Sequence, residues 1–250
     1  MESFIDATGL TKTFGGIRAV DGVSLQVNQG EVVGFLGPNG AGKTTTMRML
    51  TGFLEPTAGT VKLAGVDIDK APIAARRHFG YLPEGAPAYP DMTAREYFNF
   101  VASARGLSRA ERAVAVDAVA SRVHLTRVMD QTIETLSKGF KRRVGIAQAI
   151  LHDPKILIMD EPTDGLDPNQ KHEVRELIRE MGKRKAIVLS MHILEDVEAV
   201  CTRVVVIAAG KVVFDGTPGA FEARAPEGVS RNRMDHVFRE LTARSAEVAS

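Results

Sequence analysis

The chain has 250 residues, which is enough for one large domain or for a core with a subdomain. Its 32 Lys and Arg residues nearly balance 31 Asp and Glu residues, and it contains 11 Phe, 3 Tyr and no Trp. This near-neutral charge and the scarcity of stacking side chains argue against nucleic acid as the main partner.

The single cysteine, Cys201, excludes an internal disulfide and suits a reducing cytosol. Its apolar neighbours predict a packing role on a helix face. The N-terminus lacks the basic start and apolar core of a signal peptide. No apolar run approaches the ~20 residues that span a bilayer. We therefore expect a soluble, cytoplasmic protein that can dock on a membrane protein.

The first third of the sequence is rich in expected strands. Short apolar, β-branched runs alternate with glycine turns, which is typical of strands. The expected strands are residues 4–7, 19–27, 32–36, 60–63 and 79–82. The first two resemble the strands of a hairpin, and the third leads into a glycine-rich loop.

That loop matches the pattern G-x-x-x-x-G-K-[ST] of a phosphate-binding loop, or P-loop. It consists of Gly37, Pro38, Asn39, Gly40, Ala41, Gly42, Lys43, Thr44 and Thr45. Its glycines let several backbone N–H groups point at one anion, and a helix expected from Thr45 places its positive end there. We expect Lys43 to reach the β- and γ-phosphates and the Thr44 hydroxyl to ligate Mg²⁺. A chance glycine turn is the alternative, and the strand before the loop and the helix after it argue against that.

Residues 84–153 change to a helical pattern. Thr93 with Glu96, and Ser108 with Glu111, are capping-box pairs that each open an amphipathic run. A third helix is expected after Ser137, and it stops at residues 153–154.

Strands and helices alternate again from residue 154 onward. The expected strands are residues 156–159, 186–189, 204–208 and 212–214, and the expected helices are residues 167–181, 192–201 and 234–241. This pattern predicts an α/β fold with a mainly parallel sheet covered on both faces. We expect a P-loop core of residues 1–83 and 154–216, an antiparallel β subdomain near the N-terminus, an inserted helical subdomain of residues 84–153, and a short C-terminal helical extension of residues 217–250.

The apolar strand at residues 156–159 ends in two carboxylates, which is a Walker B pattern. Ligands sit at the carboxyl ends of parallel strands, so Asp160 is expected beside the P-loop, holding Mg²⁺ through water. Glu161 is placed to polarise the water that attacks the γ-phosphate. A strand end with solvated acids is the alternative.

The segment of residues 136–143 predicts a second anion site. Ser137 and Gly139 stand at a helix N-terminus, where backbone N–H groups attract anions. Because the P-loop already holds its own nucleotide, this site is best explained by the nucleotide of another subunit. An ordinary helix cap followed by a solvated basic face is the alternative.

Taken together, these motifs resemble the nucleotide-binding domain of ATP-binding cassette (ABC) transporters. The resemblance covers about residues 4–216 and rests on the order of the P-loop, the helical insert, the segment 136–139, Asp160 with Glu161, and then His192. It implies ATP and Mg²⁺ as cofactors. It also implies two such domains paired head to tail, a homodimer or a pair with a second ABC ATPase, with ATP between the P-loop of one and Ser137 and Gly139 of the other.

The resemblance also implies roles for other residues. Phe14 lies where an aromatic ring stacks on adenine, with a core position as the alternative. Asp167 lies in the loop that crosses the dimer axis, although it could serve only as a helix cap. His192 lies where a histidine contacts the γ-phosphate and steadies Glu161.

The chain departs from the family pattern at four positions. Glu84 stands where Gln is usual, at the joint between core and helical block, and we expect it to keep a role at the metal and in coupling. Phe140 replaces a usual Gln, Lys138 replaces a common Gly, and Met191 precedes His192 in place of a small hydroxyl residue.

The resemblance therefore implies the ATPase subunit of an ABC transporter on the cytoplasmic face of the cell membrane, working with a separate integral-membrane permease. The surface of residues 85–97 could receive a helix of that permease, or it is a plain surface loop. Residues 79–84 and 235–241 look like the efflux branch. A soluble ABC ATPase acting as a mechanical switch and a non-catalytic nucleotide sensor are the rival classes. The transported molecule cannot be read from this chain.

Overall fold

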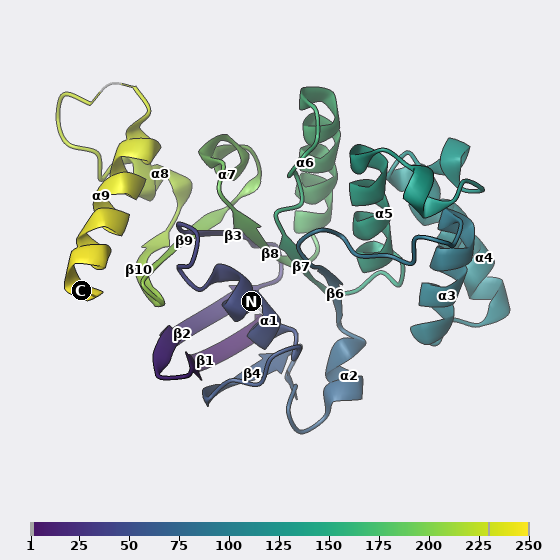
Figure 1. The fold of residues 1–250 in the computed structure, drawn as a ribbon, viewed down its shortest axis with the longest axis horizontal. Helices are drawn as coiled ribbons and strands as arrows, with labels where there is room; N and C mark the ends of the chain where they lie inside the picture. The colour runs from purple at the N-terminus through teal and green to yellow at the C-terminus, as the bar shows by residue number, and fades with distance from the viewer. Residues whose placement is uncertain (1–2, 230, 250) are drawn as a thin grey trace.

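Two β-sheets frame the protein, in a computed structural model that describes residues 3–229 and 231–249 (Figure 1). The smaller sheet has the order β2-β1-β4-β5, and its neighbours are antiparallel. Its strands are β1 (Ser3–Phe14), β2 (Ile17–Asn28), β4 (Ala58–Leu63) and β5 (Val66–Asp67). The predicted hairpin of β1 and β2 is confirmed, and both strands are longer than expected.

The larger sheet has the order β10-β9-β3-β8-β7-β6. All its neighbours are parallel except β9 and β10. Its strands are β3 (Val32–Leu36), β6 (Phe79–Leu82), β7 (Ile156–Asp160), β8 (Ala186–Met191), β9 (Arg203–Ala208) and β10 (Lys211–Gly216). Every residue of β3, β6, β7 and β8 is buried, as expected for parallel strands covered on both faces.

Helices cover both faces of the larger sheet (Figure 1). They are α1 (Lys43–Leu50), α2 (Pro72–Arg76), α3 (Ala94–Ala104), α4 (Arg109–Arg122), α5 (Lys138–Ile150), α6 (Pro168–Gly182), α7 (Leu194–Val200), α8 (Pro218–Glu222) and α9 (Arg233–Ala249), with the short 3₁₀ turns η1 (Thr126–Val128) and η2 (Ile133–Thr135). In Figure 1, α3, α4 and α5 stand together at one end of the molecule, and α8 and α9 stand at the other.

The alternation of side chains along β7 separates the core into two parts. Leu157 and Met159 pack in the cluster that includes α5, α6 and α7, whereas Ile156 and Ile158 pack with α1 and the smaller sheet. Because successive side chains of a strand point to opposite faces, one apolar strand supplies both clusters. The predicted α/β P-loop fold is confirmed.

Several predicted boundaries were wrong. The helix after the P-loop begins at Lys43 rather than Thr45, and the helix expected from residue 192 begins at Leu194. The first helix of the insert begins at Ala94 with Thr93 as its N-cap in a capping box, as predicted. α7 ends at Val200, so Cys201 is its C-cap residue and lies outside the helix. Its thiol still packs, with Sγ 3.8 Å from the sulfur of Met191, and burial raises the pKa of that thiol to about 12.

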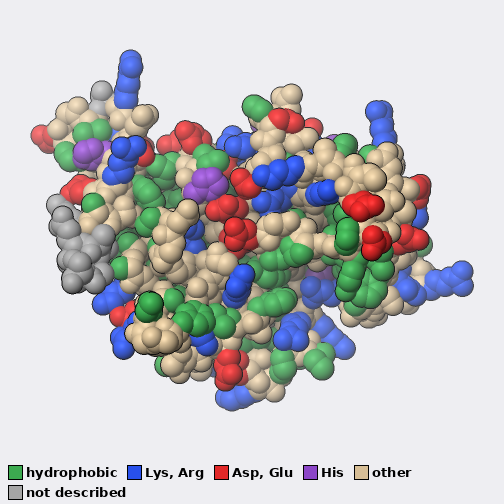
Figure 2. All heavy atoms as spheres, in the orientation of Figure 1, with side chains coloured by type: hydrophobic (Ala, Val, Ile, Leu, Met, Phe, Trp, Pro, Cys, Tyr) green, Lys and Arg blue, Asp and Glu red, His purple; other side chains and the backbone are tan. Residues whose placement is uncertain are grey.

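None of the helices within the described residues combines the length and the apolar character that crossing a bilayer requires. Figure 2 shows basic and acidic side chains interspersed over one face of the molecule, in line with the nearly balanced composition.

Candidate active site

The P-loop joins the carboxyl end of β3 to the start of α1, and two of its glycines are required by sterics. A Cβ on Gly37 would collide with the carbonyl oxygen of Ile207. Gly42 has φ +105°, and a Cβ there would lie 2.6 Å from the carbonyl oxygen of Ala19. Only glycine fits the second position without strain, because L-residues rarely adopt that conformation.

Lys43 lies folded over this loop. Its side chain is buried, and Nζ donates to the carbonyl oxygens of Gly37 at 2.6 Å and Pro38 at 3.1 Å. Burial lowers the pKa of the ammonium, and nearby carboxylates, Glu161 first, oppose that shift. The first N–H groups of α1 have no partner within the helix, so with Lys43 they form a positive site suited to an anion.

The carboxylates that follow the strands lie beside the loop. A cavity of about 300 Å³ is lined by Ala19, Asn39, Gly40, Gly42, Lys43, Thr44, Thr45, Glu84, Asp160 and Glu161. These residues come from β2, the P-loop and the ends of β6 and β7. The cavity therefore brings the P-loop together with both predicted Walker B carboxylates and Glu84.

Asp160 offers a donor set that fits Mg²⁺. Its side chain is buried, Oδ1 accepts a hydrogen bond from Ser190 Oγ, and Oδ2 has no hydrogen-bond partner among the described residues. Within those residues no group of three His, Cys, Asp or Glu side chains could hold a metal ion alone. Magnesium typically keeps several waters and binds through one or two carboxylates and substrate phosphates, so the unpartnered Oδ2 of Asp160 is a donor of the kind that it takes.

Glu161 and His192 face each other across the same edge of the sheet. Glu161 Oε1 lies 3.2 Å from His192 Nδ1. The Glu161 side chain is 24% exposed, which leaves it open to the cavity, and its backbone has φ +50°, uncommon for a residue with a side chain. Its N–H donates to Ser190 Oγ at 3.1 Å and to the Ser190 carbonyl at 3.3 Å, which holds this conformation.

Other predicted residues lie outside the cavity. Ser137 caps α5, where its Oγ accepts from the Phe140 N–H at 3.4 Å, and Asp167 caps α6 by accepting from the Gln170 N–H at 2.9 Å. Phe14, at the end of β1, is 48% exposed, and the ammonium of Lys12 lies 5.4 Å from its ring centre. Ser137, Asp167 and Phe14 are thus exposed on the surface rather than in the cavity, whereas Gly139 is buried, with the side chain of Gln170 next to it.

Comparison with known proteins identifies the family. Residues 20–164 match the family model described as ABC transporter. The chain belongs to the ABC transporter family. It is 40% identical over 89% of its length to the Nod factor export ATP-binding protein I of Paraburkholderia xenovorans, 73% of which is covered. It is 36% identical to the ABC transporter ATP-binding protein NatA of Bacillus subtilis, over 90% of this chain and 93% of NatA.

A solved ATP-binding subunit of an ABC transporter superposes on this chain with a TM-score of 0.86 at 32% identity, covering 96% of this chain and 99% of the other. The ATP-binding domains of ABC transporters are ATPases, so the predicted assignment of this chain as an ABC ATPase is confirmed.

Two supports of this ABC ATPase site were not predicted from the sequence. Ser190, fully buried in β8, joins Asp160 to the backbone of Glu161. Its signal was a single hydroxyl in an otherwise apolar strand, two residues before His192. Asp196 accepts from Thr163 Oγ1 at 2.5 Å and from Arg175 Nε at 2.7 Å, which fixes the loop after Glu161 against α6 and α7.

Proposed function

We propose that this chain binds MgATP in the cavity beside the P-loop and hydrolyses it with Glu161 as general base. The observation that carries the proposal is the Glu161 carboxylate, paired with His192 at 3.2 Å and lining the same cavity as Lys43. In this assignment Lys43 and the backbone N–H groups of Gly37 and of residues 39–45 bind the phosphates. Thr44, Asp160 and Glu84 hold Mg²⁺ directly or through water.

The chemical step needs a proton acceptor next to the attacking water. Glu161 accepts that proton as the water oxygen bonds to the γ-phosphorus, and the bond to the β-phosphate oxygen breaks to release ADP and phosphate. His192 holds the carboxylate in position and contacts the γ-phosphate. Bound Mg²⁺ would offset the charge of the phosphate oxygens.

Head-to-tail pairing gives a role to the residues outside the cavity. Ser137 and Gly139 at the start of α5 bind the phosphates held by the P-loop of a second copy, and Asp167 lies at the axis between the copies. This arrangement is isologous, because each copy gives and receives the same surface. Phe14 is exposed enough to stack on adenine.

The chain divides accordingly. Residues 1–83 and 154–216 form the ATPase core, residues 84–153 form the helical subdomain, and residues 217–250 form an extension. The extension packs on the core through the buried side chains of Phe221, Met234 and Val237, which share one cluster with β9 and α7.

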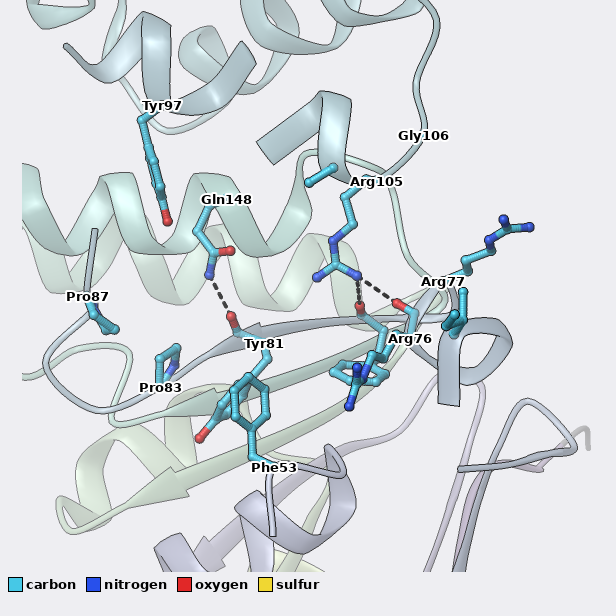
Figure 3. A pocket seen from close by; sticks show the side chains of 13 residues that line it. Phe53, Arg76, Arg77, Tyr81, Pro83, Pro87, Tyr97, Arg105, Gly106 and Gln148 are labelled. Atoms are coloured by element: carbon cyan, nitrogen blue, oxygen red, sulfur yellow. Dashed lines mark hydrogen bonds between the residues drawn. The ribbon is translucent and has the colours of Figure 1, made fainter. Parts of the chain in front are cut away.

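A groove between β6 and the helical block fits a helix of a membrane permease (Figure 3). It has a volume of about 580 Å³ and is lined by Phe53, Ile73, Arg76, Arg77, Phe79, Tyr81, Pro83, Pro87, Tyr97, Ala104, Arg105, Gly106 and Gln148. Figure 3 shows Tyr97 and Gln148 on one side and Phe53 with Tyr81 on the other. Phe53 is 72% exposed, so an apolar surface is open to a partner.

A movement of this groove can be transmitted to the nucleotide cavity through two consecutive residues of the chain. Pro83 lines the groove, and the next residue, Glu84, lines the nucleotide cavity. Gln148 Nε2 donates to the Tyr81 carbonyl at 2.6 Å, so α5 and β6 move together near this joint. ATP-driven closure of the dimer would thereby move a permease helix seated in the groove.

The relatives favour export as the direction of transport, since one of them is a Nod factor export protein. An ATPase of this kind would act at the cytoplasmic face of the membrane, where ATP and the permease meet.

Turnover by the purified chain tests the chemistry. Glu161→Gln should still bind MgATP but hydrolyse it at least ~10²-fold more slowly, and it should accumulate as an ATP-bound dimer. Glu227→Gln, in an exposed turn, is the matched control and should hydrolyse at the wild-type rate. Wild-type turnover by Glu161→Gln would overturn the general-base assignment.

A further inference from the structure

Lys138 is the residue of the α5 N-terminus to which no role has been given. It follows Ser137 directly and its side chain is 72% exposed. Nζ lies 3.3 Å from Asp164 Oδ2, in the loop between Glu161 and α6. The lysine stem lies against Gly165, where an added Cβ would collide with it. An exposed positive charge thus stands beside the two residues expected to face a phosphate, Ser137 and Gly139.

Asp164 has a second, better-fixed cation within reach. Arg142 Nη2 lies 3.8 Å from the same Oδ2. The Arg142 side chain is 5% exposed, and its Nη1 is buried without a hydrogen-bond partner among the described residues. A buried donor without an acceptor is costly, so Arg142 gains from closer contact with Asp164 if Lys138 leaves.

We propose that Lys138 is a phosphate-binding residue that acts on the second copy of the chain. Its ammonium leaves the Asp164 carboxylate and binds oxygens of the terminal phosphate of the ATP held by the P-loop of the second copy. The Arg142 guanidinium remains paired with Asp164. The inference rests on the head-to-tail dimer of the proposed function. An exposed ion pair is weak and easily broken. Charge-assisted bonds to a phosphate in a closed interface are stronger.

A permanent ion pair between Lys138 and Asp164 is the competing explanation for the same geometry. If Lys138 stays on Asp164, the pair ties α5 to the loop after Glu161, and removing either partner has the same effect. If Lys138 exchanges partners, the two removals have opposite effects.

The ATP concentration for half-maximal dimer formation by Glu161→Gln separates these cases. In the Glu161→Gln background, Lys138→Ala should raise this half-maximal ATP concentration about tenfold, because one charge-assisted hydrogen bond to the phosphate is lost. In the same background, Asp164→Asn should lower the half-maximal ATP concentration, because Lys138 is released from its ion pair. Lys141→Ala is the matched control, since Lys141 donates to the Glu134 carbonyl at 2.8 Å, and it should change nothing.

Equal increases in Lys138→Ala and Asp164→Asn, or no increase in Lys138→Ala, would overturn the inference and leave the dimer standing. Failure of Glu161→Gln itself to dimerise with ATP would instead overturn the head-to-tail dimer, and this inference with it.

Mixed dimers then test whether the lysine acts across the interface. A dimer of one Lys43→Ala copy and one Lys138→Ala copy should keep one whole site and hydrolyse ATP. A dimer of wild type with a copy that carries both substitutions should keep only a site without the lysine and hydrolyse about tenfold more slowly. The reverse order of activities would show that Lys138 acts on its own copy, against the proposal.

Discussion

Glu161 Oε1 lies 3.2 Å from His192 Nδ1, although the two residues follow different strands. β7 and β8 are parallel neighbours, so their carboxyl ends deliver both side chains to one edge of the sheet. The N–H of Glu161 is held by Ser190. The carboxylate therefore has a fixed direction before any water or phosphate reaches it, which favours catalysis by positioning.

His192→Ala removes the group that holds the Glu161 carboxylate. We expect kcat for ATP hydrolysis to fall about 100-fold, with ATP-dependent dimer formation retained because the P-loop is untouched. Steady-state kinetics and size-exclusion chromatography with ATP measure the two effects. An unchanged kcat would mean that the pair has no part in hydrolysis.

Ser190→Ala removes the hydroxyl that joins Asp160 to the Glu161 backbone. Loss of such a supporting bond typically costs a metal site 10- to 100-fold, and we expect about tenfold lower turnover and a higher Mg²⁺ requirement. A Mg²⁺ titration of ATPase activity measures both. Ser121→Ala, exposed on α4, is the control. Equal Mg²⁺ curves for the two variants would refute the supporting role.

Gly42→Ala places a Cβ 2.6 Å from the Ala19 carbonyl oxygen at a residue with φ +105°. Because backbone must move to admit it, we expect ATP binding to weaken at least tenfold, as for about 1–3 kcal/mol of strain. Gly65→Ala is matched, since Gly65 has φ +79° and open space around it. A fluorescent ATP analogue reports binding, and equal affinities would contradict the steric argument.

His152 links pH to stability. Burial, and next the Arg105 cation, lower the pKa of His152 from 6.5 to about 4, and its Nε2 lies 3.2 Å from the Phe79 carbonyl oxygen. A depressed pKa means that the contribution to stability is present above pH 6.5 and is lost as the pH falls through about 4. Denaturant midpoints at pH 7, 6 and 5 should fall more steeply for wild type than for His152→Gln. Parallel slopes would contradict the assignment.

If the groove beside β6 is the docking site of the permease, an apolar side chain exposed in it should be needed for binding. Phe53→Ser should reduce recovery of a membrane partner, because it removes an apolar side chain that is 72% exposed at the groove. Ile17→Ser is a matched change, 74% exposed on the β1–β2 hairpin and outside the groove, and it should leave recovery intact. Equal recovery with both variants would exclude the groove as the docking site.

Contiguous motifs were predictable from the sequence, and so was the meeting of Asp160 with the P-loop and of His192 with Glu161, but the contacts that support these residues were not. The P-loop and the pair Asp160 and Glu161 each follow a buried strand, so local pattern and fold agree. Ser190 and Asp196 act on residues 30 and 33 positions away, and in the sequence each is an isolated polar residue.

The predicted boundaries of helices and strands were wrong for other reasons. β1 continues past Gly9, which has φ +62° and lies in a register shift that lets the strand bend instead of ending. The helices α2 and α8 have five residues each, too few to display a helical period.

We propose above that this ATPase works on a membrane permease. The most direct test is capture of the tagged full chain from detergent-solubilised cells, with the recovered proteins identified by mass spectrometry. We predict recovery of a protein with several membrane-spanning segments, whose identity would also narrow the substrate. Recovery of soluble partners alone, or of this chain alone, would contradict the transporter assignment and favour a soluble ABC ATPase that acts as a mechanical switch.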